Sequence, residues 1–273
     1  MIFHGQFYSK YLEQDTRVMV TGPEPDPSKP YRVLYLLHPL CCNADTWCDY
    51  TRLPFYIRSY NVLCVMPEVN RSFYTDQKFG QKYFSYVGKE LPEFINRLFR
   101  VSAKREDTGV AGVSMGGYGA LRLALSFPEK FGFCAVSSSA FLFLKADLDD
   151  FRSMTDAEIA AAWGPQMKHD LEAMFGPELK AEPGDEIMTL LENTPCGCKP
   201  EIFHCCGTED IFYAQNKAFS EVMKEWGAYK YTFREWKGTH HWNFFDEFLK
   251  QALEFHYSGD KINTFSCFEQ KTV

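Results

Sequence analysis

The sequence predicts an α/β fold with a mostly parallel central sheet flanked by helices. Two short runs, residues 33–37 and 62–66, are continuously apolar, as strands buried on both faces are. Segments with apolar residues at helical spacing follow such runs, and strand and helix signals then alternate along the chain. This alternation places helices on both faces of a mainly parallel sheet.

The other elements follow from the same patterns. Residues 6–20 alternate partly between apolar and polar side chains, which predicts two lead-in strands, and three prolines in residues 21–27 then break regular structure. The further expected elements are helices at 89–99, 115–127 and 211–226 and strands at 108–113, 133–137, 202–206 and 229–235.

Residues 145–200 lack apolar strand runs and contain charged helical segments at 156–163, 169–175 and 185–192. We expect a helical insertion over the active-site edge of the sheet, acting as a lid or specificity wall, with ordinary crossover helices as the alternative. A chain of 273 residues suits one such domain, spanning 1–273. Residues 258–273 are weakly periodic and fit either a docked tail or a disordered one.

Composition limits the partners and the location. The net charge is −7 and no lysine or arginine run occurs, which argues against nucleic acid as a partner. The amino terminus lacks the pattern of a signal peptide, and no apolar run is long enough to span a membrane. We therefore expect a cytoplasmic protein with no membrane partner.

The ten cysteines favour reduced, mostly buried thiols. Vicinal pairs such as Cys41 and Cys42 rarely suit disulfide geometry. A metal site built from Cys196, Cys198 and residues 204–206 is the alternative, but it lacks paired C-x-x-C spacing, and strand residues point to opposite faces. We expect no metal.

Ser114 lies in a G-x-S-x-G sequence, Gly112 to Gly116, between an apolar strand and a helix. A serine on such a strand-to-helix turn is exposed at the carboxyl end of a sheet, as a nucleophile must be. The alternative is a chance match in a glycine-rich turn.

A serine hydroxyl needs a general base, and that base needs an orienting carboxylate. In the chain order serine, acid, base, the acid follows a late strand, and residues 202–206 run directly into Glu209 and Asp210. Asp210 is the expected acid and Glu209 the alternative. The loop after the next strand offers His240 and His241, either of which can be the base.

The tetrahedral intermediate of acyl transfer needs two backbone donors for its oxyanion. The amide after the nucleophile, that of Met115, is one. Leu40, in the loop after residues 33–37, is the candidate second donor because Pro39 has no amide hydrogen. His38 and His204 are interpreted as structural.

Four segments in order, residues 33–38, 112–120, 207–210 and 238–242, match L-Y-L-L-H-G, G-x-S-M-G-G-Y/F-G-A, G-T-E-D and G-x-H-x-W. They resemble the putative esterase family of α/β-hydrolases, which contains tributyrin esterases, S-formylglutathione hydrolases and acetylxylan or feruloyl esterases. The resemblance covers nearly the whole chain and implies the α/β-hydrolase fold. It places His240 at the base position and His241 where the family often has aspartate, while Pro39 replaces a family glycine.

The resemblance implies a serine carboxylester hydrolase that acts through an acyl-enzyme on short acyl groups, acetyl to butyryl, of sugar, glycerol or aromatic esters. It implies no metal or organic cofactor, a small-molecule ester as partner, and a plausible homo-oligomer. The alternatives are a thioesterase like S-formylglutathione hydrolase, an acyltransferase to sugar, and a non-catalytic scaffold, against which the intact order of serine, acid and base argues.

Two further expectations concern the pocket. A thiol of Cys41 or Cys42 near the acyl site would make activity sensitive to alkylation or oxidation where it is exposed. Four aromatic residues are candidate substrate-binding groups, with core packing as the alternative. They are Trp47, Tyr74, Trp163 and Tyr213.

Overall fold

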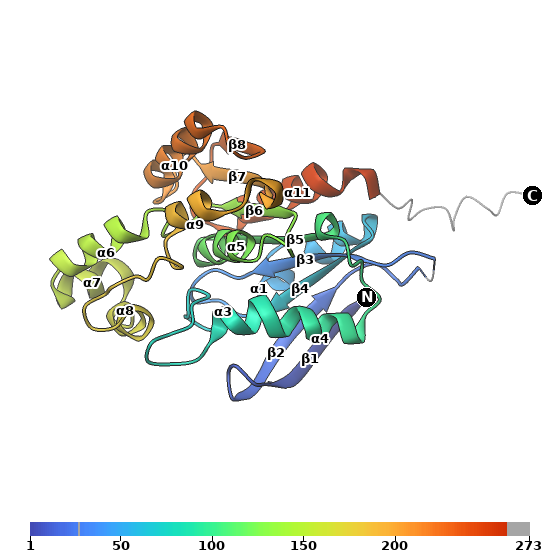
Figure 1. The fold of residues 1–273 in the computed structure, drawn as a ribbon, viewed down its shortest axis with the longest axis horizontal. Coiled ribbons are helices and arrows are strands. Elements are labelled where there is room, and N and C mark those ends of the chain that lie inside the picture. The colour runs from blue at the N-terminus through green and yellow to red at the C-terminus, as the bar shows by residue number, and fades with distance from the viewer. Residues whose placement is uncertain (27, 261–273) are drawn as a thin grey trace, which may run out of the picture.

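The computed structural model describes residues 1–26 and 28–260. Eight strands form one sheet in the order β1-β2-β4-β3-β5-β6-β7-β8 (Figure 1). The strands are β1 (Ile2–Ser9), β2 (Gln14–Thr21), β3 (Arg32–Leu37), β4 (Val62–Pro67), β5 (Thr108–Val113), β6 (Phe133–Ser137), β7 (Glu201–Gly207) and β8 (Tyr231–Trp236). The β1–β2 and β2–β4 pairs are antiparallel and all later pairs are parallel, which confirms the predicted mostly parallel sheet.

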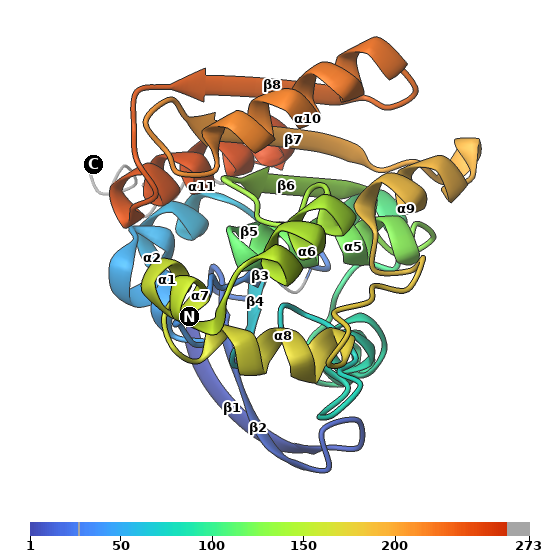
Figure 2. The same cartoon turned by 90° about the vertical axis from the view of Figure 1, so that its left-hand side faces the viewer.

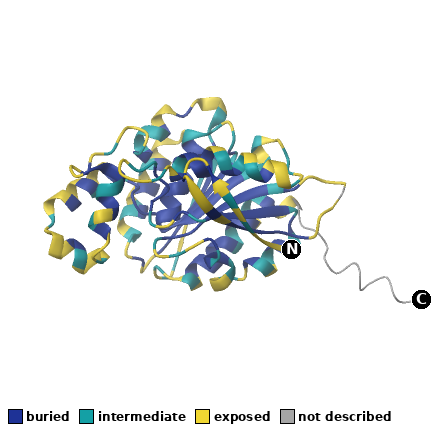
Figure 3. Cartoon of the chain, turned by 90° about the horizontal axis from the view of Figure 1, so that it is seen from below, coloured by how far each residue is buried: buried dark blue, intermediate teal, exposed yellow. Residues whose placement is uncertain are grey.

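Helices cover both faces of the sheet because its central strands are apolar on both sides. Val33 and Tyr35 of β3 pack into one core cluster, and Leu34 and Leu36, which point to the opposite face, pack into another. These central strands are accordingly buried along nearly their whole length, whereas the edge strand β1 is largely exposed (Figure 3). The first cluster is covered by α4 (Leu91–Leu98), α5 (Met115–Ser126) and α10 (Tyr213–Trp226), and the second by α1 (Thr46–Tyr50), α2 (Leu53–Tyr56) and α11 (Trp242–Tyr257).

One helix begins earlier than predicted. The helical stretch expected at 89–99 starts with α3 (Tyr83–Ser85), continues through a π turn (Tyr86–Glu90) and ends in α4. The buried side chains of Tyr83 and Tyr86 extend its apolar face toward the amino terminus. Gly88, a residue type that normally weakens a helix, obscures this in the sequence.

The predicted insertion lies between β6 and β7 and is helical. It contains α6 (Leu144–Ser153), α7 (Asp156–Trp163), α8 (Met167–Phe175) and α9 (Ile187–Asn193). Figure 2 shows α6, α7 and α8 gathered at one end of the molecule, in front of the sheet. Leu148 of α6 and Leu171 of α8 are buried in the first core cluster, so these helices pack onto the domain. Their role as a lid stays a prediction.

None of the helices in residues 1–26 and 28–260 has both the length and the apolar character needed to cross a bilayer. Residues 258–260 form a short turn at the end of α11. The remainder of the predicted tail, 261–273, lies outside the described residues.

Candidate active site

Ser114 lies between β5 and α5 in a conformation that L-residues rarely adopt. Its φ is 56° and its ψ is −120°, and such backbone strain is concentrated at functional sites. Two hydrogen bonds hold the turn in place: the Ser114 amide donates to the Ser137 carbonyl at 3.1 Å, and the Ala140 amide donates to the Ser114 carbonyl at 3.2 Å. The end of β6 therefore fixes the serine at the carboxyl edge of the sheet.

Glycines make this turn possible. A Cβ added to Gly112 would lie 2.2 Å from the Gly116 carbonyl oxygen, and one added to Gly116 would lie 2.4 Å from the Leu37 carbonyl oxygen. The first turn of α5 therefore contacts the end of β3 directly, and a side chain at either glycine would force these backbones apart.

Asp210 and His240, from the loops after β7 and β8, are in contact. His240 Nδ1 lies 3.1 and 3.0 Å from the two Asp210 carboxylate oxygens, and the Asp210 side chain is completely buried. Because the carboxylate can only accept, Nδ1 carries the proton and Nε2 is left as an acceptor. The rings of Phe212 and Phe245, each 5.2 Å from the imidazole and edge-on to it, hold the ring in position.

The two alternative residues are placed differently. The Glu209 side chain is 53% exposed and lies 3.7 Å from Lys237 Nζ, so it faces solvent. His241 is exposed at the start of α11, where its carbonyl accepts the amides of Phe244 and Phe245. In this structure Asp210 pairs with His240, and neither Glu209 nor His241 takes part in that pair.

Ser114 and His240 line one cavity of about 340 Å³. Its walls are mostly apolar and come from the loop after β3, the loop after β6, the insertion and the start of α11. The insertion contributes Asp147, Phe151, Trp163 and Met167. A cavity of this size can enclose a small acyl group and part of an alcohol.

Of the four aromatic residues predicted to bind substrate, only Trp163 lines this cavity, where it stacks on Phe212 at 5.9 Å. Trp47 is fully buried in the core beside Trp242. Tyr74 is also fully buried, and Tyr213 points to Glu235 on the surface. Contrary to the prediction, these three do not line the cavity, and the two buried ones contribute to the core instead.

The two predicted oxyanion donors lie on neighbouring segments. Met115 is the first residue of α5, where helical amides have no acceptor within the helix. Leu40 lines the cavity from the loop after β3. In the described part of the chain, no hydrogen bond to a protein acceptor occupies either amide, so both are available to a ligand.

Sequence reasoning missed Asn216, which supports the serine from α10. Its amide group bonds both the amide and the carbonyl of Ser139, each at 2.9 Å, and so holds the loop next to Ser114. It also accepts from His204 Nε2 at 2.9 Å, and burial lowers the pKa of His204 to about 4, which keeps that imidazole neutral. A polar helix residue usually faces solvent, so the sequence offers no signal for this role.

Asp147 was also missed. It is the only carboxylate among the cavity's described lining residues, and one of its oxygens accepts from Gln215 Nε2 at 2.6 Å. The other oxygen and Gln215 Oε1 are buried and have no partner in the structure. Burial raises the pKa of Asp147 to about 6. Its position facing the cavity depends on how the insertion packs, which the sequence does not reveal.

Cys41 and Cys42 both line the cavity, as expected for thiols beside the acyl site. Cys41 is exposed, and its sulfur lies 2.9 Å from Arg71 Nη1, while Arg71 Nε donates to Asp170 at 2.7 Å. Within residues 1–26 and 28–260, no three histidine, cysteine, aspartate or glutamate side chains are grouped so that they could hold a metal ion. Cys267 lies outside the described residues.

Comparison with known proteins places this site in a family. The family described as "Putative esterase" matches residues 9–256. An acetyl esterase from Caldicellulosiruptor saccharolyticus is 30% identical over 265 residues, which cover 93% of this chain and 97% of that protein.

Solved structures agree in fold. FphF, a fluorophosphonate-binding serine hydrolase from Staphylococcus aureus, has a TM-score of 0.81 at 24% identity, covering 94% of this chain and 98% of that one. The S-formylglutathione hydrolase FrmB, also from Staphylococcus aureus, has a TM-score of 0.78 at 24% identity, covering 94% and 99%. The match to the family across almost the whole chain establishes that this protein belongs to the putative esterase family.

Proposed function

We propose that this protein hydrolyses short-chain carboxylic esters through a triad of Ser114, His240 and Asp210. The observation that carries the proposal is the pairing of His240 Nδ1 with both oxygens of the buried Asp210 carboxylate, at the wall of a cavity that Ser114 also lines. This pairing leaves Nε2 of His240 free to accept the serine proton, which is what a general base needs.

In the proposed reaction, Ser114 Oγ attacks the ester carbonyl carbon while its proton passes to His240 Nε2. The carbonyl oxygen becomes an oxyanion that accepts hydrogen bonds from the Leu40 and Met115 amides. The bond to the alcohol then breaks, and His240 returns the proton to the departing oxygen. Water deprotonated by His240 attacks the acyl-enzyme in the same way, which releases the acid and restores Ser114.

The cavity supports a small, largely apolar acyl group. Its volume of about 340 Å³ includes aromatic walls from Phe141, Phe151 and Phe212. The relative at 30% identity is named as an acetyl esterase. We therefore propose acetyl to butyryl esters as substrates, with a sugar, glycerol or aromatic alcohol.

The test compares wild type with Ser114→Ala on p-nitrophenyl acetate, butyrate, hexanoate and octanoate. We expect turnover of acetate and butyrate to exceed that of octanoate, and Ser114→Ala to lose kcat by a factor on the order of 10⁶, as removal of a catalytic serine does in other serine hydrolases. Ser126→Ala, at the opposite end of the same helix, is the matched control and should keep wild-type turnover.

Other outcomes would redirect the proposal. Activity retained in Ser114→Ala would exclude this serine as nucleophile. Faster turnover of an S-acyl glutathione than of every oxygen ester would favour a thioesterase. Appearance of acylated sugar when a sugar acceptor is added would favour an acyltransferase.

A further inference from the structure

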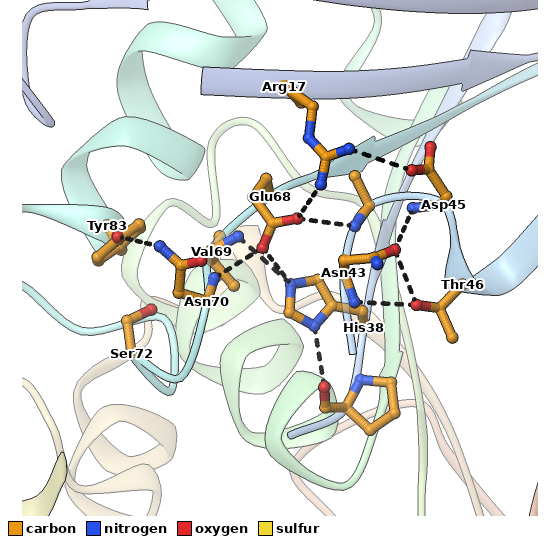
Figure 4. A network of polar contacts seen from close by, with 12 residues as sticks. Arg17, His38, Asn43, Asp45, Thr46, Glu68, Val69, Asn70, Ser72 and Tyr83 are labelled. Carbon is orange, nitrogen blue, oxygen red and sulfur yellow. Dashed lines mark hydrogen bonds and ion pairs between the residues drawn. The ribbon is translucent and has the colours of Figure 1, made fainter. Parts of the chain in front are cut away.

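A network of polar contacts around the buried side chain of His38 supports the loop that carries the Leu40 amide (Figure 4). His38 is the first residue of this loop, directly after β3, and its side chain is only 1% exposed. Glu68 and Asn70, from the loop after β4, and Arg17 of β2 complete the surroundings. None of these residues belongs to the proposed triad.

The hydrogen bonds of His38 determine which of its nitrogens carries the proton. The Val69 amide lies 3.3 Å from His38 Nε2, and because an amide N–H only donates, Nε2 is the acceptor. Burial lowers the pKa of His38, so the ring is neutral and its proton is on Nδ1. Nδ1 lies 2.9 Å from the Pro39 carbonyl oxygen and donates to it.

This bond orients the next amide. The Pro39 carbonyl and the Leu40 N–H belong to one peptide unit, and no cis peptide bond occurs in the described residues. In a planar trans peptide the C=O and the N–H point in opposite directions. With the oxygen held on the side of His38, the Leu40 N–H points away from His38. Leu40 lines the same cavity as Ser114.

We propose that His38 is a positioning residue that orients the Leu40 amide toward the oxyanion of the tetrahedral intermediate. The inference rests on the proposed ester hydrolysis and names a residue outside its triad. Donation to the Pro39 carbonyl also polarises the peptide, which makes the Leu40 N–H a stronger donor.

Two further contacts keep His38 in place. Tyr74 donates its hydroxyl proton to the His38 carbonyl at 3.0 Å, which explains the position of this tyrosine beneath the site. Glu68 accepts the Ala44 amide at 3.2 Å and the Asn70 amide at 2.9 Å, and lies 3.7 Å from His38 Nε2. The carboxylate therefore ties the loop after β3 to the loop after β4.

The test compares His38→Met, which removes the donor, with His38→Gln, which keeps an N–H donor on a side chain of similar reach. Loss of one oxyanion donor typically lowers kcat by about 10²- to 10³-fold. Misorienting it should lower kcat about 10- to 100-fold in His38→Met with KM within about threefold, since the interaction is made only in the transition state. A trifluoromethyl ketone, which forms an oxyanion adduct with the serine, should bind more weakly by the same factor, and His38→Gln should restore part of both losses.

Wild-type kcat and ketone affinity in His38→Met would overturn the inference, as would a loss of activity that only follows the unfolded fraction measured by circular dichroism. If His38→Met does not fold, Glu68→Gln replaces it: a several-fold fall in both quantities supports the inference, and no change in either overturns it. Ser114→Ala separates the two proposals, because activity retained there refutes the triad, whereas an inactive Ser114→Ala beside a fully active His38→Met refutes only the role of His38.

Discussion

Replacing Asp210 by asparagine should disable the proposed base without disturbing the fold. One Asp210 oxygen accepts both the Phe212 amide, at 2.8 Å, and His240 Nδ1, at 3.1 Å, while the other oxygen accepts only from His240. In Asp210→Asn the side-chain carbonyl oxygen can still accept the hydrogen bond from the Phe212 amide. This orientation presents the side-chain NH₂ group to His240. That donor favours an imidazole protonated on Nε2, and such a ring cannot accept the proton of Ser114.

The expected loss follows from the same change in a trypsin-like triad, where it lowers kcat about 10⁴-fold, equivalent to about 5 kcal/mol of transition-state stabilisation. Glu209→Gln is the matched control. Because the Glu209 side chain is 53% exposed and 3.7 Å from Lys237, its ion pair contributes about 0–1 kcal/mol to stability at most, and kcat should stay within about twofold.

Both variants would be assayed with p-nitrophenyl butyrate, and their folding would be checked by thermal unfolding. An Asp210→Asn enzyme that is folded and keeps more than about a tenth of wild-type kcat would refute the reasoning, because an imidazole protonated on Nε2 cannot act as the general base. An equal loss in Glu209→Gln would instead assign the acid to Glu209.

Three further predictions concern other parts of the cavity and the turn. Burial raises the pKa of Asp147 to about 6, above about 4 in the unfolded chain, so its protonated form stabilises the fold at low pH and this contribution is lost as pH rises to 6. Asp147→Asn should therefore raise the free energy of unfolding by roughly 2–3 kcal/mol at pH 8 but not at pH 3; equal urea midpoint shifts at both pH values would contradict this. Iodoacetamide should abolish esterase activity by modifying Cys41 at the cavity wall. The Cys41→Ser variant should then keep its activity after treatment, whereas the control Cys196→Ser should lose it, and equal losses in both variants would contradict the prediction. Gly116→Ala should destabilise the fold by about 3 kcal/mol or more, because its Cβ would lie 2.4 Å from a backbone oxygen; Gly197→Ala, with open space around its Cβ, is the control in urea unfolding, and similar stability of the two variants would disprove the clash.

Much of the fold could be predicted because its signals are local. Continuous apolar runs indicated β3 and β4 within a residue or two of their bounds, since strands covered on both faces need such runs. The helix expected at 156–163 coincides with α7, whose start is marked by a Thr155–Glu158 capping box. The helix before β5 begins earlier than its predicted start at residue 89, because burial of Tyr83 and Tyr86 extends the helical stretch across Gly88.

The sequence by itself determined the family segments, the strand-to-helix turn at Ser114 and the two loops that supply an acid and a base. Only the tertiary structure decided that Asp210 rather than Glu209 contacts His240, that Trp163 alone of the four aromatic candidates lines the cavity, and which groups support the site from outside the motifs. The physical reason is the separation along the chain of the residues that interact. A turn or a strand follows from neighbours a few residues away, whereas the direction of one side chain in a loop depends on distant segments packed against it.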